Sequence, residues 1–409
     1  MLPRMRSSYG FLWRDRRFGW FVLVSLLPRV GFFMLPLGIL LYVRGQTGSV
    51  ATAGFALGAF GLASATQPVR GRLVDRYGRL VPVALGVACA ASLLLLIAAG
   101  HSRPALIGAC VLAGLTLPPT GAYTRAVLTT ALSGDPVRTR SAYAADSALT
   151  EGALVLGPLI VAAVVSIGGR TSTIVVSALA IEIGTIALSL TTVARTVALG
   201  EPAASAGVGA GGAAEGRGTR TAIRIVLGAT LCVTVALGVV DVAVPVFALR
   251  HGSVADAGLL LGVLAAGTAL GALWCGSHPP AMALERQMTI YTAPLVACIG
   301  AMALVNSPLL LGALLVLTGF AIGPLYVVLY ALIEQSVSAG DRTRAFAWEV
   351  TVTNTGAAVG SAAAGVIIAG SGLHAALGVA AAAVAVGLAV GLALVLSPIA
   401  TPAHNPAQS

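Results

Sequence analysis

Charged and polar side chains inside apolar segments are the residues of this sequence that could do chemistry. Arg29, Glu151, Glu182, Asp241 and Asn354 each fall within a long apolar run. If these runs cross a membrane, a charge at mid-depth costs at least about 2.5–3.5 kcal/mol on insertion scales, so it should face a cavity or a partner. One Arg cannot neutralise three carboxylates, so the surplus must be protonated, hydrated or paired with a cation. The set predicts substrate binding with proton coupling, and a structural ion pair between Arg29 and Glu151 is the alternative.

Four further charged residues lie nearer the ends of apolar runs, namely Arg125, Asp146, Glu334 and Glu349. A side chain near a helix end can reach the polar interface at low cost. For these four we therefore expect structural roles.

A short basic segment separates the second apolar run from the third. It reads Gly71-Arg72-Leu73-Val74-Asp75-Arg76-Tyr77-Gly78-Arg79. We expect Gly71 and Gly78 to permit a tight turn, and the arginines, Arg76 and Arg79 among them, to hold the segment at an anionic membrane surface. Asp75 is its one acidic residue and needs a partner.

This segment resembles the signature loop of the major facilitator superfamily, G-x-L-a-D-R-x-G-R, at every defined position. The resemblance implies a carrier in which the Asp at position 75 sits against the start of the eleventh helix, near Arg344, and helps lock the outward-facing state. The corresponding loop of the second half, residues 275–283, has lost the pattern. Gly157-Pro158 resembles the core of the drug–proton antiporter motif, but Val161-Ala162 stands where that motif has Gly-Gly.

The chain also repeats itself. Gly48–Gly54 reappears as Gly252–Gly258, and Arg138-Thr139-Arg140 reappears as Arg342-Thr343-Arg344, both 204 residues later. A duplicated apolar chain is typical of transporters built from two related halves.

A spanning helix needs about 20 mostly apolar residues. Twelve such runs predict an all-α integral membrane protein with two six-helix repeats: 18–43, 49–69, 80–100, 105–132, 141–168, 172–194, 223–249, 256–276, 288–305, 308–334, 345–370 and 374–396. The predicted organisation is a first half (1–195), a flexible cytoplasmic linker (196–221) rich in Gly and Ala, a second half (222–397) and a cytoplasmic tail (398–409).

Prolines mark candidate helix breaks beside a central cavity. Pro118 and Pro119 fall in the fourth span and Pro324 falls at the corresponding place in the tenth, while Pro36 and Pro245 fall in the first and seventh. Interrupted helices at matching positions of two halves point to a binding site.

The distribution of arginine sets the orientation. With a cytoplasmic N-terminus, the inner loops and helix ends carry eighteen arginines and the outer loops carry four: Arg44, Arg103, Arg170 and Arg250. Cytoplasmic loops of membrane proteins are basic, so both termini are expected inside a multi-pass protein of the cytoplasmic (inner) membrane.

Composition excludes most other classes. Hydrophobic residues make up 57% of the chain and charged residues 9%, and the mean hydropathy is +0.95. The net charge of +10 lies in short loops between apolar runs, so nucleic acid is not an expected partner. No catalytic motif, metal-ligand spacing or nucleotide-binding motif is present, so we expect neither an enzyme nor a cofactor or bound metal.

The sequence thus predicts a monomeric secondary transporter whose partners are a small molecule, protons and the lipid bilayer. Proton-coupled efflux of an amphipathic or cationic compound is favoured. Transport of a polar metabolite such as a sugar is the alternative, followed by a non-transporting membrane sensor with the same fold.

Overall fold

The computed structural model describes residues 16–132, 136–196, 217–252, 254–277, 282–336 and 342–396, and all regular structure in these ranges is helical. In the first half the helices are α2 (Arg16–Val24), α3 (Leu26–Thr47), α4 (Val50–Ser64), α5 (Gln67–Tyr77), α6 (Leu80–Ala98), α7 (Arg103–Thr116), α8 (Thr120–Ala131), α9 (Pro136–Leu190) and α10 (Thr192–Thr196). In the second half they are α11 (Arg217–His251), α12 (Val254–Ser277), α13 (Leu284–Met302), α14 (Pro308–Ser336), α15 (Arg342–Gly370) and α16 (Leu373–Leu396).

The predicted all-helical membrane protein is confirmed in its coarse form. Nine helical stretches of the described residues are long and apolar enough to cross a membrane. One of them, Gly152–Leu190, overlaps both the fifth and the sixth predicted runs, whereas Val50–Ser64 is a shorter apolar helix. Twelve crossings therefore stay a prediction, although each of the twelve predicted runs falls on helix.

The domain boundaries stay a prediction. Helix α11 begins at Arg217, five residues before the predicted start of the second half at 222. The linker residues 197–216 and the tail 397–409 lie outside the described residues.

Glycine and serine define the turn in the first copy of the repeated segment. Gly48 ends α3 with φ of 65°, and its amide donates to the carbonyl oxygen of Arg44 at 2.9 Å. Ser49 then caps α4, since its side chain accepts a hydrogen bond from the amide of Thr52 at 3.2 Å. A left-handed residue that closes one helix and a serine that opens the next are efficient end signals.

Helix α9 is bent rather than straight. Gly169 has φ of 77° and ψ of −176° and separates a segment before it from a segment after it. A residue with a side chain adopts this conformation only at a cost, so glycine sets the turn between the fifth and sixth predicted spans.

Within each half the helices approach closely at glycines, at matching places. A Cβ atom on Gly114 would lie 2.5 Å from the carbonyl oxygen of Phe60, and one on Gly319 would lie 2.2 Å from that of Leu264. These two contacts are related by the sequence repeat, with offsets of 205 and 204 residues. Small residues let backbones meet where lipid offers no hydrophobic driving force.

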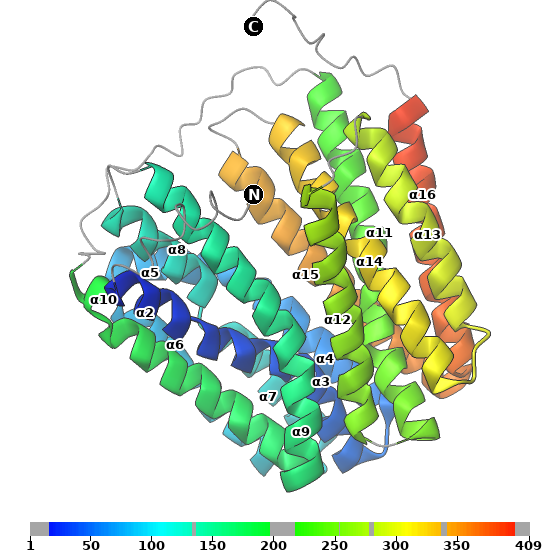
Figure 1. The fold of residues 1–409 in the computed structure, drawn as a ribbon. Coiled ribbons are helices and arrows are strands. Elements are labelled where there is room, and N and C mark those ends of the chain that lie inside the picture. The colour runs from blue at the N-terminus through cyan, green and yellow to red at the C-terminus, as the bar shows by residue number, and fades with distance from the viewer. Residues whose placement is uncertain are drawn as a thin grey trace, which may run out of the picture.

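The two halves pack through α4 against α15 and through α9 against α12 (Figure 1). Glycine again makes the contacts: a Cβ on Gly54 would lie 2.6 Å from the carbonyl oxygen of Ser361, and one on Gly258 would lie 2.3 Å from that of Pro158. Both contacts lie near the ends of the helices at which α4 and α12 begin.

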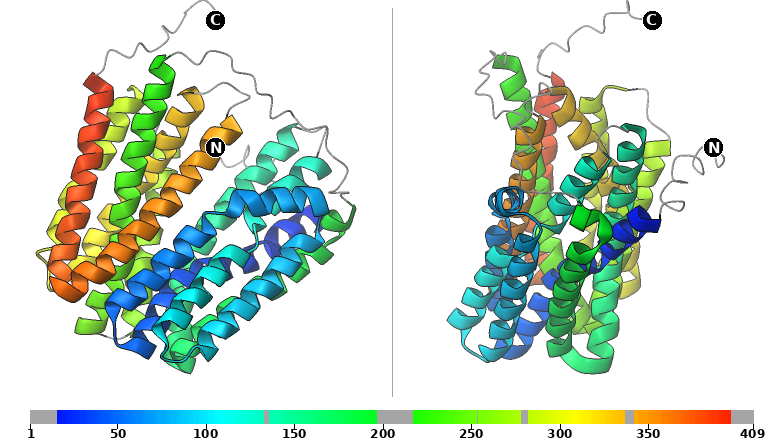
Figure 2. Two further views of the ribbon diagram at one scale, coloured as in Figure 1. Left: turned by 180° about the vertical axis from the view of Figure 1, so that it is seen from behind. Right: turned by 90° about the vertical axis from the view of Figure 1, so that its left-hand side faces the viewer.

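At the opposite end the helices of the two halves diverge, as the left view in Figure 2 shows. Among the described residues, α5 and α8 at this end pack against elements of their own half. The molecule is therefore closed at the end where α4 and α12 begin and open at the end where α11 and α15 begin.

A bulky residue at the closed contact should push the halves apart. Gly54→Leu would place a side chain against the α15 backbone, and overpacking of this kind costs about 1–3 kcal/mol. We expect it to raise the rate at which a membrane-impermeant thiol reagent labels a cysteine at Ser361, which is 3% exposed.

The matched control is Gly108→Leu, because nothing lies within 4 Å of a Cβ at Gly108. That variant should label at the parental rate. Equal labelling of Ser361→Cys with and without Gly54→Leu would contradict the prediction.

Candidate functional site

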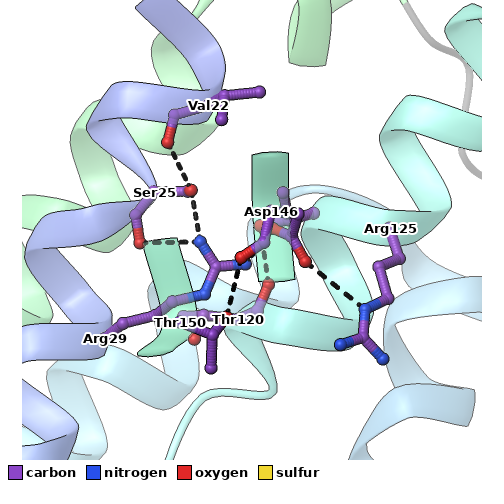
Figure 3. A network of polar contacts seen from close by, with 8 residues as sticks. Val22, Ser25, Arg29, Thr120, Arg125, Asp146 and Thr150 are labelled. Carbon is purple, nitrogen blue, oxygen red and sulfur yellow. Dashed lines mark hydrogen bonds and ion pairs between the residues drawn. The ribbon is translucent and has the colours of Figure 1, made fainter. Parts of the chain in front are cut away.

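Two buried charges of the first half form an ion pair. Arg29 on α3 and Asp146 on α9 are 4% and 0% exposed, and Nη2 of Arg29 donates to Oδ1 of Asp146. Nη1 of the same guanidinium donates to the side chain of Ser25 and, at 3.2 Å, to its carbonyl oxygen (Figure 3). Two charges that neutralise each other and share further hydrogen bonds can persist at low dielectric.

Ser25 lies where the first predicted span changes from α2 to α3. Its hydroxyl donates to the carbonyl oxygen of Val22 at 2.6 Å while it accepts from Arg29. The hydrogen bonds of Arg29 thus reach both the helix junction and α9.

A second arginine approaches the same carboxylate from α8. Nε of Arg125 lies 3.4 Å from Oδ2 of Asp146, and the Arg125 side chain is 59% exposed. Thr150 donates to the backbone carbonyl of Asp146 at 2.9 Å (Figure 3). Asp146 therefore joins α3, α8 and α9, with two cations around one anion.

This arrangement corrects one expectation. Asp146 is fully buried and paired with Arg29, not a carboxylate at an exposed helix end. The reason is length: α9 begins at Pro136, so Asp146 lies within the packed bundle rather than at its rim. The side chain of Glu151 lies outside what the structure describes.

The second half carries a buried carboxylate at the corresponding place. Glu349 on α15 is 2% exposed and accepts a hydrogen bond from the hydroxyl of Thr353 at 2.8 Å. It stands 203 residues after Asp146, one position from the repeat. No basic side chain among the described residues forms an ion pair with Glu349; the two ion pairs that they form both involve Asp146.

Asp241 and Asn354 lie on helices of the second half. Asp241, on α11, is partly exposed and lies ten residues before the helix ends at His251, about 15 Å along the axis. No described residue forms a hydrogen bond or ion pair with its carboxylate. Asn354 is partly exposed on α15, one residue beyond Thr353.

Glu182 stands apart from these residues. Both of its carboxylate oxygens are buried and have no hydrogen-bond partner among the described residues. It faces α6, because a Cβ on Gly86 would lie 2.4 Å from Oε2, whereas its neighbours Ile181 and Gly184 pack on α3. The structure does not bring Glu182 together with Arg29.

The predicted helix breaks are present at one place only. The fourth span is interrupted at residues 117–119, around Pro118 and Pro119. Pro36, Pro245 and Pro324 lie inside continuous helices, so the expected breaks at these positions are wrong. A membrane helix tolerates an isolated proline when its neighbours and small local adjustments satisfy the freed carbonyl.

The signature loop is mostly helix. Gly71 lies within α5 instead of in a tight turn, and nothing lies within 4 Å of a Cβ built on it. Gly78 makes the turn, with φ of 76°, and its amide donates to the carbonyl oxygen of Val74 at 2.8 Å. Arg76 lies over the ring of Tyr77, 5.4 Å from its centroid.

The side chain of Asp75 lies outside what the structure describes, and so do the side chains of Arg342 and Arg344. Arg79, the last residue of the motif, precedes α6 and accepts a hydrogen bond from Ser189 through its carbonyl oxygen at 3.4 Å. A contact between the loop and the start of α15 therefore stays a prediction.

Comparison with known proteins agrees with this architecture. Residues 226–409 match the model of the Major Facilitator Superfamily. No curated protein sequence matches the chain.

Several solved transporters share the fold. A mutant of the nucleoside transporter NupG superposes with a TM-score of 0.74 at 12% identity, over 92% of this chain and 99% of that one. The POT family transporter PepTSo gives 0.72 at 10% identity, over 93% and 99%. A bacterial homologue of the iron transporter ferroportin, in an inward-facing state, gives 0.72 at 14% identity, over 93% and 99%.

Residues 226–409 thus match the family model, and nearly the whole chain has the fold that these transporters share. Together with the apolar helices, this describes a multi-pass membrane protein with a transporter fold.

The pairing of Arg29 predicts an asymmetric response to mutation. Asp146→Asn removes the carboxylate and leaves a buried guanidinium without its counter-charge, which costs about 3–5 kcal/mol where a buried pair is broken. The double variant Arg29→Gln with Asp146→Asn should recover much of the lost thermal stability, measured on purified protein in detergent.

Arg125→Gln is the control, since its side chain is 59% exposed and screened by solvent. It should lower the melting temperature much less than Asp146→Asn does. A double variant less stable than Asp146→Asn alone would contradict the pairing as the source of the effect.

Proposed function

We propose that the chain is a secondary active transporter that carries a small molecule across the cytoplasmic membrane by alternating access. The observation that carries this proposal is the contact between the halves, which is made mainly by α4 with α15 and α9 with α12 and lies toward one end of the molecule. Residues 1–195 would rock against residues 222–397 around these contacts. Glycine-lined surfaces can separate without exposing large apolar side chains.

The arginine distribution assigns the open end to the cytoplasm. Helices α11 and α15 begin at this end, and Arg217, Arg220, Arg342 and Arg344 lie in their first turns. Basic residues favour the cytoplasmic side. The proposed conformation is then inward-open. The proposed transporter acts as a monomer.

Charge balance supports proton coupling. Asp146 is neutralised by Arg29, whereas Glu182 in the same half and Asp241 and Glu349 in the second half have no basic partner among the described residues. Carboxylates of this kind inside a membrane protein mark ion and substrate pathways. Asp241 is partly exposed, so a proton or a cation can reach it, and together with Glu151 it is the proposed coupling group.

We favour efflux of an amphipathic or cationic compound, because the uncompensated charges are negative. A polar metabolite such as a sugar is the second candidate. It is supported by the stacked rings of Tyr326 and Tyr330 on α14, whose centroids are 6.1 Å apart and which could hold a flat or ring-shaped solute.

The test is transport by protein reconstituted into proteoliposomes under an imposed pH gradient. Cationic dyes, sugars and nucleosides serve as probes, and empty liposomes serve as the control. Gradient-dependent movement of any probe supports the proposal. Absence of movement for every probe, with a correctly folded preparation, would favour a non-transporting sensor.

Asp241→Asn should separate coupling from binding. The amide keeps the size of the side chain and much of its hydrogen bonding, but it cannot exchange a proton. We expect proton-driven accumulation to be abolished while downhill exchange of the same probe continues, and Glu151→Gln is measured in the same assay.

Glu285→Gln is the matched control, because Glu285 lies in the first turn of α13 and outside the proposed pathway. It should accumulate the probe normally. Accumulation at the parental level by Asp241→Asn would exclude Asp241 as a coupling group.

Asp75→Asn tests the signature loop. The charge is expected to stabilise a contact formed in the other conformer only, so its loss should shift the population of states rather than unfold the protein. Transport should fall while membrane expression stays normal. Undiminished transport would limit the loop to a topological role.

A further inference from the structure

Arg70 on α5 is a buried arginine that forms no ion pair among the described residues. It is 4% exposed, and its two terminal nitrogens donate to backbone carbonyls of two other helices. Nη2 donates to the carbonyl oxygen of Ser64, the last residue of α4, at 2.9 Å, and Nη1 donates to that of Gly114 on α7.

The two carbonyls share one property in the sequence. In an α-helix a carbonyl accepts from the amide four residues later. Four residues after Ser64 stands Pro68, and four residues after Gly114 stands Pro118, and proline has no amide hydrogen. Arg70 thus donates to the two carbonyls that these prolines cannot serve.

The end of α4 shows how complete this pairing is. The carbonyls of Gly61 and Leu62 both accept from the amide of Ala65, at 3.1 and 3.2 Å, and that of Ala63 accepts from the amide of Thr66 at 3.3 Å. Among the last four carbonyls of α4, only that of Ser64 has no recorded backbone amide donor, so the Arg70 side chain provides its partner. Every terminal carbonyl of a helix needs such a partner from outside the helix's own hydrogen bonds.

We propose that Arg70 is a positioning residue. Its guanidinium replaces two missing proline amides, maintains the helix break at residues 117–119 of the fourth span, and links this break to the signature-loop helix α5. The planar fork of a guanidinium can serve two acceptors at once, which an ammonium group does poorly. Burial lowers the pKa of Arg70 to about 10, so the group stays charged at neutral pH.

The second half provides an internal comparison. At the repeat positions of Pro68, Arg70 and Pro118 it carries Ala272, Trp274 and Gly323, so both amides are present and the arginine is not. Helix α12 is continuous over Val254–Ser277 and α14 over Pro308–Ser336. The break and the arginine therefore occur together in one half and are both missing in the other.

The break sets the place of the residues that follow it. Helix α8 begins at Thr120, directly after the helix break, and places Arg125 within 3.4 Å of Asp146. Arg70 touches neither of these two side chains. Its role in their geometry is to fix where α7 ends and α8 begins.

Hydrogen exchange of backbone amides tests this role without any substrate. In Arg70→Gln the carbonyl of Gly114 loses its donor, and we expect the amides of Thr120 and Tyr123 to exchange about tenfold faster, the effect of one lost hydrogen bond. Arg70→Lys should show a smaller increase in rate. Adding Pro118→Ala to Arg70→Gln restores an amide four residues after Gly114 and should return the exchange to near the parental rate.

Arg72→Gln is the matched control, because it removes the same charge from an exposed position of the same helix. It should leave exchange at Thr120 unchanged. A parental exchange rate in Arg70→Gln, the same acceleration in Arg72→Gln, or no rescue by Pro118→Ala would overturn the proposal.

A variant that does not fold still decides the question. If Arg70→Gln fails to accumulate in the membrane, recovery of expression by Pro118→Ala supports the replacement of a proline amide. Failure of expression in the double variants with Pro118→Ala and with Pro68→Ala would overturn it.

Discussion

The architecture depends on one constraint: a polar group within hydrocarbon must find its partner inside the protein. Regular helices meet it along most of the chain, and side chains meet it where a helix is interrupted. At the junction of α2 and α3, Arg29 donates to Ser25 and pairs with Asp146. At the ends of α4 and α7, Arg70 donates to carbonyls that prolines leave without an amide. Two arginines thus make irregular backbone acceptable within the first half, and in both cases the side chain also joins its own helix to another.

The interface between the halves follows the opposite rule, because it has to form and separate. Its contacts are backbone against backbone at Gly54, Gly58 and Gly258, with no ion pair among the described residues. Close approach of small residues gains dispersion energy over a narrow strip and leaves no unpaired charge when the strip parts. Strong polar links within the first half and glycine contacts between halves are what rigid-body rocking requires.

Much of this could be predicted from the sequence, and the failures have physical causes. The turn at Gly48, the turn at Gly78 and the break at Pro118 follow from local patterns and lie where they were expected, whereas Gly71 of the signature loop lies within a helix. Asp146 was not expected as a buried partner of Arg29 because depth was counted from predicted helix ends, and α9 begins earlier than expected. The breaks expected at Pro36, Pro245 and Pro324 failed because one missing amide can be accommodated by tertiary packing that the sequence does not display.

The two halves have diverged in how they treat charge and proline. The first half pairs Asp146 with an arginine and supports its helix breaks with another, and it also holds Glu182, which has no partner among the described residues. The second half has unbroken helices at the repeat positions, and its carboxylates Asp241 and Glu349 have no basic partner among the described residues. A carboxylate paired with an arginine resists protonation, because a nearby positive charge favours its ionised form. A carboxylate without a basic partner lacks this restraint. The two halves therefore share one framework but differ at a few positions: an arginine ion pair and arginine-supported helix breaks occur in the first half, and the described part of the second half has neither.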